Sequence, residues 1–257
     1  MAAFEGRVAV VSGGASGIGA ACVAALRREG ATAVAWDIAG EFDVYCDASD
    51  EASVVAALEQ TEARFGIPSL HVASAGVRGY PAPITEIPVE AWDAAFAVNV
   101  RGVFLTLRTI ASRMIAAGLD GSIVTVSSVQ GMIPDPVLSL YSATKAAVYQ
   151  MTRVAAIELG PHGIRVNAIG PGPTVTAMTE RLAGSDEWRR QVEDVTPLGR
   201  VGSPELVADA AVNIMRSEWI TGQCVLADGG SSLISARGAT RARLHTEELA
   251  ERRESPR

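Results

Sequence analysis

Short apolar runs alternate with longer stretches of helical periodicity along most of the chain. The runs are rich in Val, Ile and Ala, and they are Val8 to Val11, Ala33 to Trp36, Leu70 to Ala73, Ser122 to Val126, Ile164 to Ile169 and Cys224 to Ala227. Such alternation is typical of repeated βα units that build a parallel sheet. Because the runs are apolar throughout, helices should cover both faces of the sheet. The pattern predicts an α/β fold with one open, doubly wound parallel sheet.

The chain is long enough for one domain of this kind, and we place that domain at residues 1–234. Its 257 residues are 48% hydrophobic, which is enough to bury a sizeable core. The Gly/Pro-rich stretch 170–173 interrupts regular structure, and the polar segment at about 174–202 is interpreted as a mobile cover over a site. Residues 235–257 are charged and form a predicted tail, for which a solvated face is favoured over a binding element.

Charge and cysteine content exclude several classes of function. The 22 basic and 29 acidic residues give a net charge of -7, so nucleic acid is not an expected partner. The cysteines, Cys22, Cys46 and Cys224, lack the spacing of a disulfide framework or a metal site. The chain starts without a basic segment followed by an apolar one, and we find no apolar stretch of ~18 residues. We therefore expect a cytoplasmic protein that binds neither membrane nor metal.

A glycine-rich turn follows the first apolar run. It reads Ser12-Gly-Gly-Ala-Ser-Gly-Ile-Gly19 and precedes a helical pattern from Ala20 to Arg28. Gly13, Gly17 and Gly19 let the backbone approach a pyrophosphate closely, and the helix start offers free N–H groups. A tight turn without a ligand is the alternative, but the order of strand, glycine turn and helix favours dinucleotide binding.

A tyrosine and a lysine share one face of a predicted helix that runs to about Leu159. Tyr141 and Lys145 are four residues apart, and Lys145 is the only lysine among the 22 basic residues. A free phenol has a pKa of ~10, so it needs a nearby cation to act as a base near neutrality. Ser128 follows the run that ends at Val126, at the carboxyl edge of the sheet, where doubly wound folds bind ligands. These three side chains are candidate catalytic residues.

Together these motifs resemble the short-chain dehydrogenase/reductase family. The shared features are the Gly-x3-Gly-x-Gly spacing, in which Ser12 replaces the usual threonine, and the Tyr141-x3-Lys145 pair with Ser128 thirteen residues before it. The resemblance covers residues 5–233. It implies a single-domain Rossmann fold, a homotetramer, a nicotinamide cofactor, and oxidation of a secondary alcohol or reduction of a ketone.

The resemblance also implies a role for each catalytic residue. Tyr141 would be the acid/base, Lys145 would lower its pKa and bind ribose, and Ser128 would bind the substrate oxygen, with Ser127 the less favoured neighbour. Asn99 would hold a water in a proton relay through Lys145. A polar residue that bends a helix is the alternative reading of Asn99.

The implied cofactor site draws on several segments of the chain. The family's Asn-Asn-Ala-Gly segment stands here as Ala73-Ser-Ala-Gly76, which lacks both asparagines. A plain proline turn remains the alternative for the segment that contains Pro171 and Thr176. Besides Tyr141 and Lys145, the expected cofactor-binding residues are Gly13, Ser16, Gly17, Ile18, Gly19, Asp37, Asp47, Ala48, Ala75, Gly76, Pro171, Gly172, Thr174 and Thr176.

Asp37 makes NAD the expected cofactor. It lies 18 residues after Gly19, where a carboxylate accepts hydrogen bonds from the adenosine ribose and repels a 2'-phosphate. Ser16 stands where NADP-preferring relatives often carry an arginine. A turn or helix cap is the alternative role for Asp37.

The substrate and two rival functions stay open at this point. The expected substrate lining of Gln130, Ile133, Val137, Leu138 and parts of 174–200 is mostly apolar, which favours a neutral alicyclic or hydroxy compound over a large anion. Asp135 is interpreted as a turn cap. The rivals are a catalytically silent dinucleotide-binding regulator or scaffold, and a lyase or epimerase on the same fold.

Overall fold

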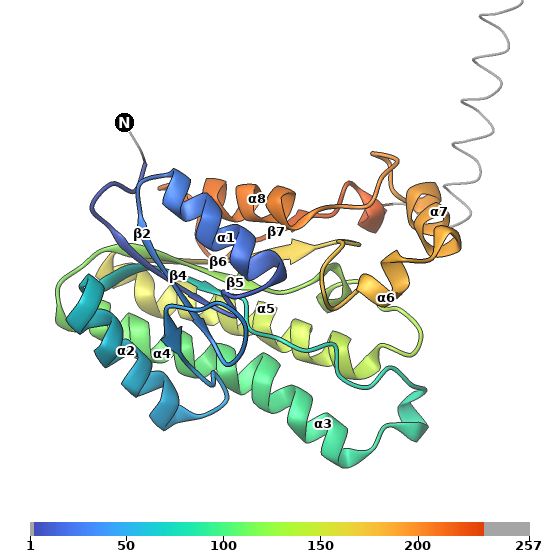
Figure 1. Ribbon diagram of the computed structural model, residues 1–257, viewed down its shortest axis with the longest axis horizontal. Helices are drawn as coiled ribbons and strands as arrows, with labels where there is room; N and C mark the ends of the chain where they lie inside the picture. The colour runs from blue at the N-terminus through green and yellow to red at the C-terminus, as the bar shows by residue number, and fades with distance from the viewer. Residues whose placement is uncertain (1–2, 234–257) are drawn as a thin grey trace, which may run out of the picture.

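A computed structural model describes residues 3–233, which form a seven-stranded parallel sheet between two layers of helices (Figure 1). The spatial order of the strands is β3-β2-β1-β4-β5-β6-β7. The predicted doubly wound sheet is thus confirmed, while the predicted tail lies outside the described residues. The strands are β1 (Val8–Ser12), β2 (Thr32–Asp37), β3 (Val44–Tyr45), β4 (Pro68–Ala73), β5 (Gly121–Val126), β6 (Ile164–Pro171) and β7 (Cys224–Ala227).

The helices divide between the two faces of the sheet (Figure 1). One face is covered by α1 (Gly17–Arg28) and α8 (Pro204–Arg216), and the other by α2 (Glu51–Phe65), α4 (Gly102–Ala116) and α5 (Ser139–Leu159). Two short helices, α6 (Glu180–Ala183) and α7 (Asp186–Val195), lie beyond the end of β6. The remaining elements are α3 (Val89–Phe96), the π-helix η2 (Ala97–Arg101) and the 3-10 turns η1 (Ile84–Glu86), η3 (Val129–Gly131), η4 (Gly160–His162) and η5 (Ser231–Leu233).

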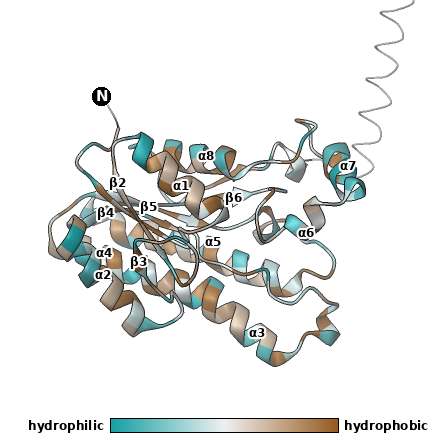
Figure 2. Ribbon diagram, viewed as in Figure 1, coloured by the Kyte–Doolittle hydropathy of each residue, from teal (hydrophilic) through white to brown (hydrophobic). Residues whose placement is uncertain are grey.

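The sheet separates two hydrophobic cores. Along β1, Ala9 and Val11 pack with α1 and α8, whereas Val8 and Val10 pack with α2, α4 and α5. This follows from the two-residue period of a strand, whose side chains point alternately to opposite faces. Figure 2 shows the consequence: the strands are mostly brown, and α7, at the rim, is largely teal. A strand buried on both faces must be apolar throughout, as the sequence pattern indicated.

All six apolar runs are strands, and β3 is the strand that the pattern missed. It has two residues, Val44 and Tyr45, which pair with Trp36 and Asp37 of β2. Val44 is buried and Tyr45 is exposed. Two residues are too few to produce a recognisable period, so the hydrophobic pattern gave no sign of this strand.

The expectation that no stretch could span a membrane needs a correction. Within residues 3–233, the continuous helical stretch Val89–Ala116 is long and apolar enough for a membrane span by length and composition. The sequence reading looked for an uninterrupted apolar run, whereas this stretch carries Asn99, Arg101 and Arg108. Half of its most apolar window is buried inside the molecule, and its C-terminal part, α4, packs on β4 and β5. It is a core helix of the fold.

The topology fixes where a ligand can bind. After β1 the chain moves to β2 and β3 on one side, and after β4 it moves to β5, β6 and β7 on the other. The connections therefore diverge between β1 and β4, and they leave a crevice at the carboxyl ends of these strands.

Candidate active site

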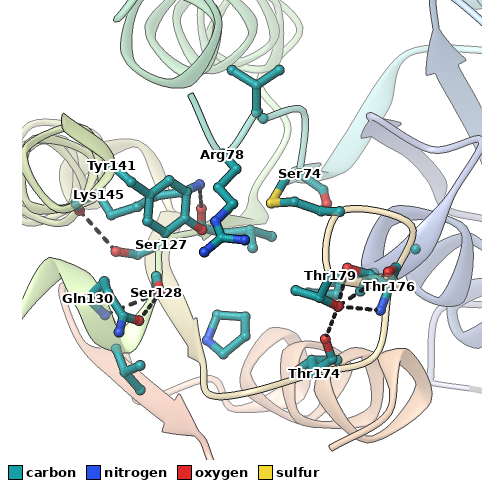
Figure 3. A pocket seen from close by; sticks show the side chains of 18 of the residues that line it. Ser74, Arg78, Ser127, Ser128, Gln130, Tyr141, Lys145, Thr174, Thr176 and Thr179 are labelled. Atoms are coloured by element: carbon teal, nitrogen blue, oxygen red, sulfur yellow. Dashed lines mark hydrogen bonds between the residues drawn. The ribbon is translucent and has the colours of Figure 1, made fainter. Parts of the chain in front are cut away.

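A cavity of about 790 Å³ lies at the carboxyl edge of the sheet. The segments that follow β1, β2, β3, β4, β5 and β6 line it, together with residues of α5 and α7. Figure 3 shows Tyr141, Lys145, Ser127, Ser128 and Gln130 on one side and the threonines of the loop after β6 on the other. Segments far apart in the sequence thus converge on one site.

The glycine turn forms one wall of the cavity. Gly13 has a φ of +69°, and a Cβ there would lie 2.7 Å from the Ala75 backbone. The side chain of Ser16, the N-cap of α1, makes no capping hydrogen bond, and the first turn of α1 has no acidic residue. The N–H groups at this helix start therefore remain available to an anion, as a dinucleotide pyrophosphate requires.

Gly19 differs from Gly13 and Gly17. It does not line the cavity, and a Cβ there would overlap the carbonyl oxygen of Gly13. Its effect on a ligand is thus indirect, because it lets the turn fold onto α1. The expected cofactor residues that line the cavity are Gly13, Ser16, Gly17, Ile18, Asp37, Asp47, Ala48, Ala75, Gly76, Tyr141, Lys145, Pro171, Gly172, Thr174 and Thr176.

Asp37 ends β2 at the rim of the cavity. Its Oδ2 accepts a hydrogen bond from the Ala15 N–H at 3.0 Å, and its Oδ1 accepts one from the Ile38 N–H at 2.8 Å. The carboxylate therefore has the structural role that was the alternative in the sequence analysis. Each carboxylate oxygen has a further lone pair, so the same group can still accept hydrogen bonds from ribose hydroxyls.

Asp47, like Asp37, has a structural role in addition to its expected contact with the cofactor. Its Oδ1 accepts hydrogen bonds from the Ser49 N–H at 2.9 Å and the Ser49 hydroxyl at 2.7 Å, which fixes the loop before α2. The segment after β4 also lines the cavity, and its small residues allow close approach. A Cβ on Gly76 would lie 3.2 Å from Asn99 Oδ1 and 3.5 Å from Lys145 Nζ.

The loop after β6 is organised by a threonine that the sequence reading missed. Thr179 Oγ1 donates to the Thr174 carbonyl at 2.6 Å and accepts from the Thr176 N–H at 2.9 Å. The Thr176 hydroxyl lies 3.3 Å from the same oxygen. Figure 3 shows the three side chains grouped at one end of the cavity. The expected ligands Thr174 and Thr176 are thus held by Thr179.

Tyr141 and Ser128 are neighbours on one side of the cavity. Burial raises the pKa of the Tyr141 phenol above its ordinary value, while hydrogen bonding to Ser128 and the positive charge of Arg78 act in the opposite direction. Ser128 Oγ also donates to Gln130 Oε1 at 3.3 Å and accepts from the Gln130 N–H at 3.2 Å. A phenol and a hydroxyl that bond to each other can hold one substrate oxygen between them.

The neighbouring Ser127 has a different partner. Its hydroxyl donates to the carbonyl of Lys145 at 2.9 Å and is buried with it. This bond ties β5 to α5, so Ser127 fixes the helix that carries Tyr141. The geometry therefore favours Ser128 over Ser127 as the group that contacts substrate.

Lys145 is buried and bonded to the backbone. Its Nζ donates to the Val126 carbonyl at 2.8 Å and lies 5.6 Å from the centroid of the Tyr141 ring. Burial lowers the pKa of Lys145 to about 8. The expected effect of Lys145 on the Tyr141 pKa is not among the influences seen at the phenol in this structure, where Ser128 and Arg78 supply the lowering.

Asn99 does not line the cavity. It is fully buried in the π-helix η2, where its Oδ1 accepts from the Val77 N–H at 2.7 Å. Its Nδ2 donates to the Val77 carbonyl at 2.8 Å and to Thr144 Oγ1 at 3.1 Å. The amide thus joins the loop after β4 to α5, and its expected role in a proton relay stays a prediction.

Only some of the residues expected to line the substrate side do line the cavity. Gln130, Ile133 and Leu138 line the cavity, but Val137 does not. Within residues 3–233, Val137 is the one non-glycine residue with a positive φ, at 59°, and its carbonyl accepts from the Ala82 N–H. That backbone conformation was not predictable from the local sequence.

The cover contains a short amphipathic helix. The cavity-facing residues of α7 are Trp188, Gln191, Val192 and Val195, and Ser185 caps the helix by accepting from the Trp188 N–H. Residues of this segment therefore line the site, and its role as a mobile cover stays a prediction. Across the described part of the chain, no group of three or more His, Cys, Asp or Glu side chains is arranged to hold a metal ion.

Comparison with known proteins agrees with the site. A family model described as enoyl-(acyl carrier protein) reductase matches residues 13–232. A 2,5-dichloro-2,5-cyclohexadiene-1,4-diol dehydrogenase from Sphingobium indicum is 36% identical over 250 residues, which cover 91% of this chain and 100% of the relative.

Two similar solved structures contain a nicotinamide cofactor. The 3-ketoacyl-(acyl-carrier-protein) reductase from Brucella melitensis complexed with NADH has a TM-score of 0.81 and 33% identity, covering 89% of this chain and 99% of that one. The gluconate 5-dehydrogenase from Burkholderia cenocepacia in complex with NADP and tartrate has a TM-score of 0.85 and 29% identity, covering 90% and 97%.

Fold and site together define an oxidoreductase that uses a nicotinamide dinucleotide. The chain belongs to the short-chain dehydrogenase/reductase family. The resemblance in its motifs is thereby confirmed, and its relatives are dehydrogenases and reductases of alcohol or ketone substrates.

Proposed function

We propose that this protein is an NAD-dependent dehydrogenase that interconverts a secondary alcohol and a ketone. The observation that carries the proposal is the convergence of Tyr141, Ser128 and Lys145 on one cavity that the glycine turn also lines. The open N-terminus of α1 and the small residues at 75 and 76 suit a dinucleotide. When bound, the cofactor accepts a hydride from the carbinol carbon or returns one to the ketone.

The proton path runs through Tyr141. In the oxidation direction, the alcohol O–H proton passes to the phenolate oxygen of Tyr141, and the Ser128 hydroxyl donates a hydrogen bond to the developing alkoxide. The alcohol and NAD⁺ become the ketone, NADH and one proton. With a pKa of about 8, Lys145 is mostly cationic at neutral pH. In this proposal its charge favours the phenolate and its donors bind ribose.

Asn99 acts as a positioning residue in this scheme. Both amide hydrogens and the amide oxygen are already engaged with Val77 and Thr144. In this proposal Asn99 supports a proton relay through Lys145 with its backbone carbonyl. Asn99 lies in the π-helix η2, and a π-helix departs from the usual hydrogen-bond ladder, so this carbonyl can accept a bond from a water.

NAD is favoured over NADP by the charge at the adenosine end. The Asp37 carboxylate lies at the cavity rim, where a 2'-phosphate would meet like charge. The glycine turn carries Ser16 rather than an arginine. The two solved relatives bind NADH and NADP respectively, so the choice depends on these residues of this chain.

A homo-oligomer, with a tetramer as the family expectation, is part of the proposal. Apolar side chains are exposed on α4 and α5, with Phe104 at 44%, Val154 at 44% and Ile157 at 77% of their full exposure. A cytoplasmic location fits the three free cysteines, Cys22, Cys46 and Cys224.

The proposal is tested with a panel of secondary alcohols and ketones, each assayed with NAD(H) and NADP(H). We expect turnover of some members with NAD(H) at a higher kcat/KM than with NADP(H). Tight cofactor binding without turnover of any member would instead favour the silent regulator. Conversion of an alcohol without net reduction of the cofactor would favour a lyase or epimerase.

A further inference from the structure

Arg78 is a cavity residue to which the sequence analysis gave no role. It lies two residues after Gly76, in the segment that leaves β4, and its side chain lines the cavity. Figure 3 shows it extending between Tyr141 and Ser74 toward the middle of the cavity. Its charge is close enough to act on the Tyr141 phenol. The guanidinium therefore lies at the catalytic end of the site.

The guanidinium of Arg78 has no partner within residues 3–233. No hydrogen bond or ion pair joins it to another described residue. Some arginines elsewhere are engaged: Arg165 donates to the carbonyls of Met215 and Ser217, and Arg27 pairs with Asp43. A guanidinium carries five N–H donors and stays charged, so these donors are free to bind a ligand.

The backbone that carries Arg78 is held in place. The preceding residue, Val77, is bonded through both its N–H and its carbonyl to the fully buried amide of Asn99. The same amide donates to Thr144 on α5, one residue before Lys145. Arg78 is thus anchored to the helix that carries the catalytic pair, as a binding residue must be to discriminate between ligands.

The catalytic end of the cavity has an excess of positive charge. Arg78 and Lys145 are its two cations, and an oxidised nicotinamide would add a third. Among the cavity carboxylates, Asp135 is the one on the substrate side, and it already accepts from Gln130 Nε2 at 3.2 Å. Asp37 and Asp47 belong to β2 and the loop after β3, at the far side of the sheet order. An anionic group on the substrate would balance this charge.

We propose that Arg78 binds a carboxylate of the substrate while Ser128 and Tyr141 hold its carbinol oxygen. The inference rests on the proposed dehydrogenase function and narrows its substrate to a hydroxy acid or the matching oxo acid. A planar guanidinium suits a planar carboxylate because two parallel N–H···O bonds form at once. Ile133 and Leu138 also line the cavity, so the rest of the substrate skeleton is apolar. This proposal differs from the neutral substrate that the lining alone leads one to expect.

The test compares each carboxylate with its neutral carboxamide. The panel contains hydroxycarboxylates with the hydroxyl at different distances from the carboxylate, each paired with the corresponding hydroxyamide. A hydrogen bond to a charged group contributes ~1.5–3 kcal/mol, so the wild-type kcat/KM should favour the better carboxylates by roughly 10- to 100-fold. Because the ratio is taken within each pair, changes in the Tyr141 pKa that affect both substrates cancel.

Two variants assign the preference to Arg78. In Arg78→Gln the carboxylate preference should fall to near unity, and in Arg78→Lys, which keeps the charge without the fork, an intermediate preference should remain. The dissociation constant of NAD, measured by calorimetry, should be unchanged in both. A wild-type enzyme without carboxylate preference, or an Arg78→Gln enzyme that keeps it, would overturn the inference. So would a weakened NAD affinity with the carboxylate preference intact, since Arg78 would then bind the cofactor.

A binding measurement separates this inference from the proposed function. Cyclohexanecarboxylate and cyclohexanecarboxamide, which carry no alcohol, are titrated into the full-length protein saturated with NAD. We expect the carboxylate to bind more tightly in the wild type and no better than the amide in Arg78→Gln. Equal binding in the wild type, alongside oxidation of neutral alcohols, would remove the carboxylate subsite and leave the dehydrogenase function standing. Carboxylate-selective binding without oxidation of any alcohol would instead fail the proposed function.

Discussion

At the scale of single residues, Lys145 shows how composition and structure inform each other. The sequence shows that it is the only lysine, and the structure shows it buried beside Tyr141 with one hydrogen bond to the Val126 carbonyl. An ammonium is compact enough for this space, whereas a planar guanidinium is larger and needs more partners. The charge is retained there at the expense of stability, which makes a functional role the best explanation for it.

The destabilisation caused by burying the Lys145 ammonium can be measured as a pH dependence of the free energy of unfolding. Burial lowers the pKa of Lys145 from 10.5 to about 8, so between these values the unfolded chain binds more protons than the folded one. Stability therefore rises with pH in this window, by about 3 kcal/mol in total. Lys145→Met should lack this rise and should be more stable than the wild type at neutral pH. This stability difference should shrink by about 3 kcal/mol as the pH reaches 10.5.

Urea denaturation of the cofactor-free proteins across this pH range provides the measurement. Arg153→Met is the matched control, because Arg153 is an exposed cation on the same helix. Its stability difference from the wild type should be flat with pH. A Lys145→Met difference that is equally flat would show that the buried ammonium is not destabilising.

Asp37 is predicted to set the choice between NAD and NADP. Asp37→Asn removes the negative charge that repels a 2'-phosphate, and it weakens the hydrogen bonds to ribose. The ratio of the NADP to the NAD dissociation constant should therefore fall by roughly 10-fold or more. Calorimetry measures both constants. Asp47→Asn serves as the control: the family resemblance implies that Asp47 contacts adenine, which both cofactors share, so this change should leave the ratio unchanged. The prediction is wrong if Asp37→Asn also leaves it unchanged.

Most of the candidate site was predictable because its chemistry depends on residue types at fixed spacing. Tyr141 and Lys145 are one helical turn apart, and Gly13 and Gly17 are needed wherever a backbone must approach a phosphate. Arg78 was not predictable, since nothing in the sequence shows that an arginine lacks a partner. The engagement of Asn99 with Val77 was hidden for the same reason: it joins segments 22 residues apart.

At the scale of elements, strand prediction succeeded where burial on both faces forces apolar runs. It failed at β3, whose two residues pair only with the end of β2. The π-helix η2 also escaped prediction, because its wider turn depends on what Asn99 binds and not on local propensity. The cover at 174–202 is an expectation from its composition, whereas the helix α7 inside it became apparent only in the structure.

The glycine turn allows a matched test at this scale. Gly13 and Gly118 both have a positive φ, of 69° and 63°, but a Cβ would contact the Ala75 backbone at 2.7 Å in the first and nothing within 4 Å in the second. Gly118→Ala should therefore cost about 1 kcal/mol of stability and leave NAD binding intact. Gly13→Ala should cost more and weaken NAD binding, because Ala75 must move.

Urea denaturation and NAD calorimetry on both variants distinguish strain from contact. Equal losses of stability and unchanged NAD affinity in the two proteins would mean that the close approach of the glycine turn to the β4 loop has no bearing on the cofactor site.

At the scale of the whole molecule, the fold encloses two cores and leaves an apolar outer face on α4 and α5. Beside this face lies a shallow hollow, lined by Asp93 and Phe96 of α3, Ala97, Val100 and Arg101 of η2, Phe104 of α4 and Met151 of α5. Exposed apolar clusters of this kind mark surfaces that associate. We expect the wild type to be a homotetramer by light scattering, and Phe104→Glu with Ile157→Glu to shift it to smaller species.

The control for this prediction is Val55→Glu on α2, which changes a residue of similar exposure, 41%, outside that face. It should keep the wild-type mass. A monomeric wild type, or a double variant that stays tetrameric, would refute the assignment of this face as an interface.

The central claim is that Tyr141 transfers the proton in an NAD-dependent oxidation of a secondary alcohol. The most direct measurement is the rate of NADH formation by the wild type and by Tyr141→Phe, with the dissociation constant of NAD determined for both. We predict that the variant loses roughly 10²- to 10⁴-fold in kcat, as expected for a missing general acid/base, and binds NAD as the wild type does. A Tyr141→Phe protein that forms NADH at the wild-type rate would contradict the account.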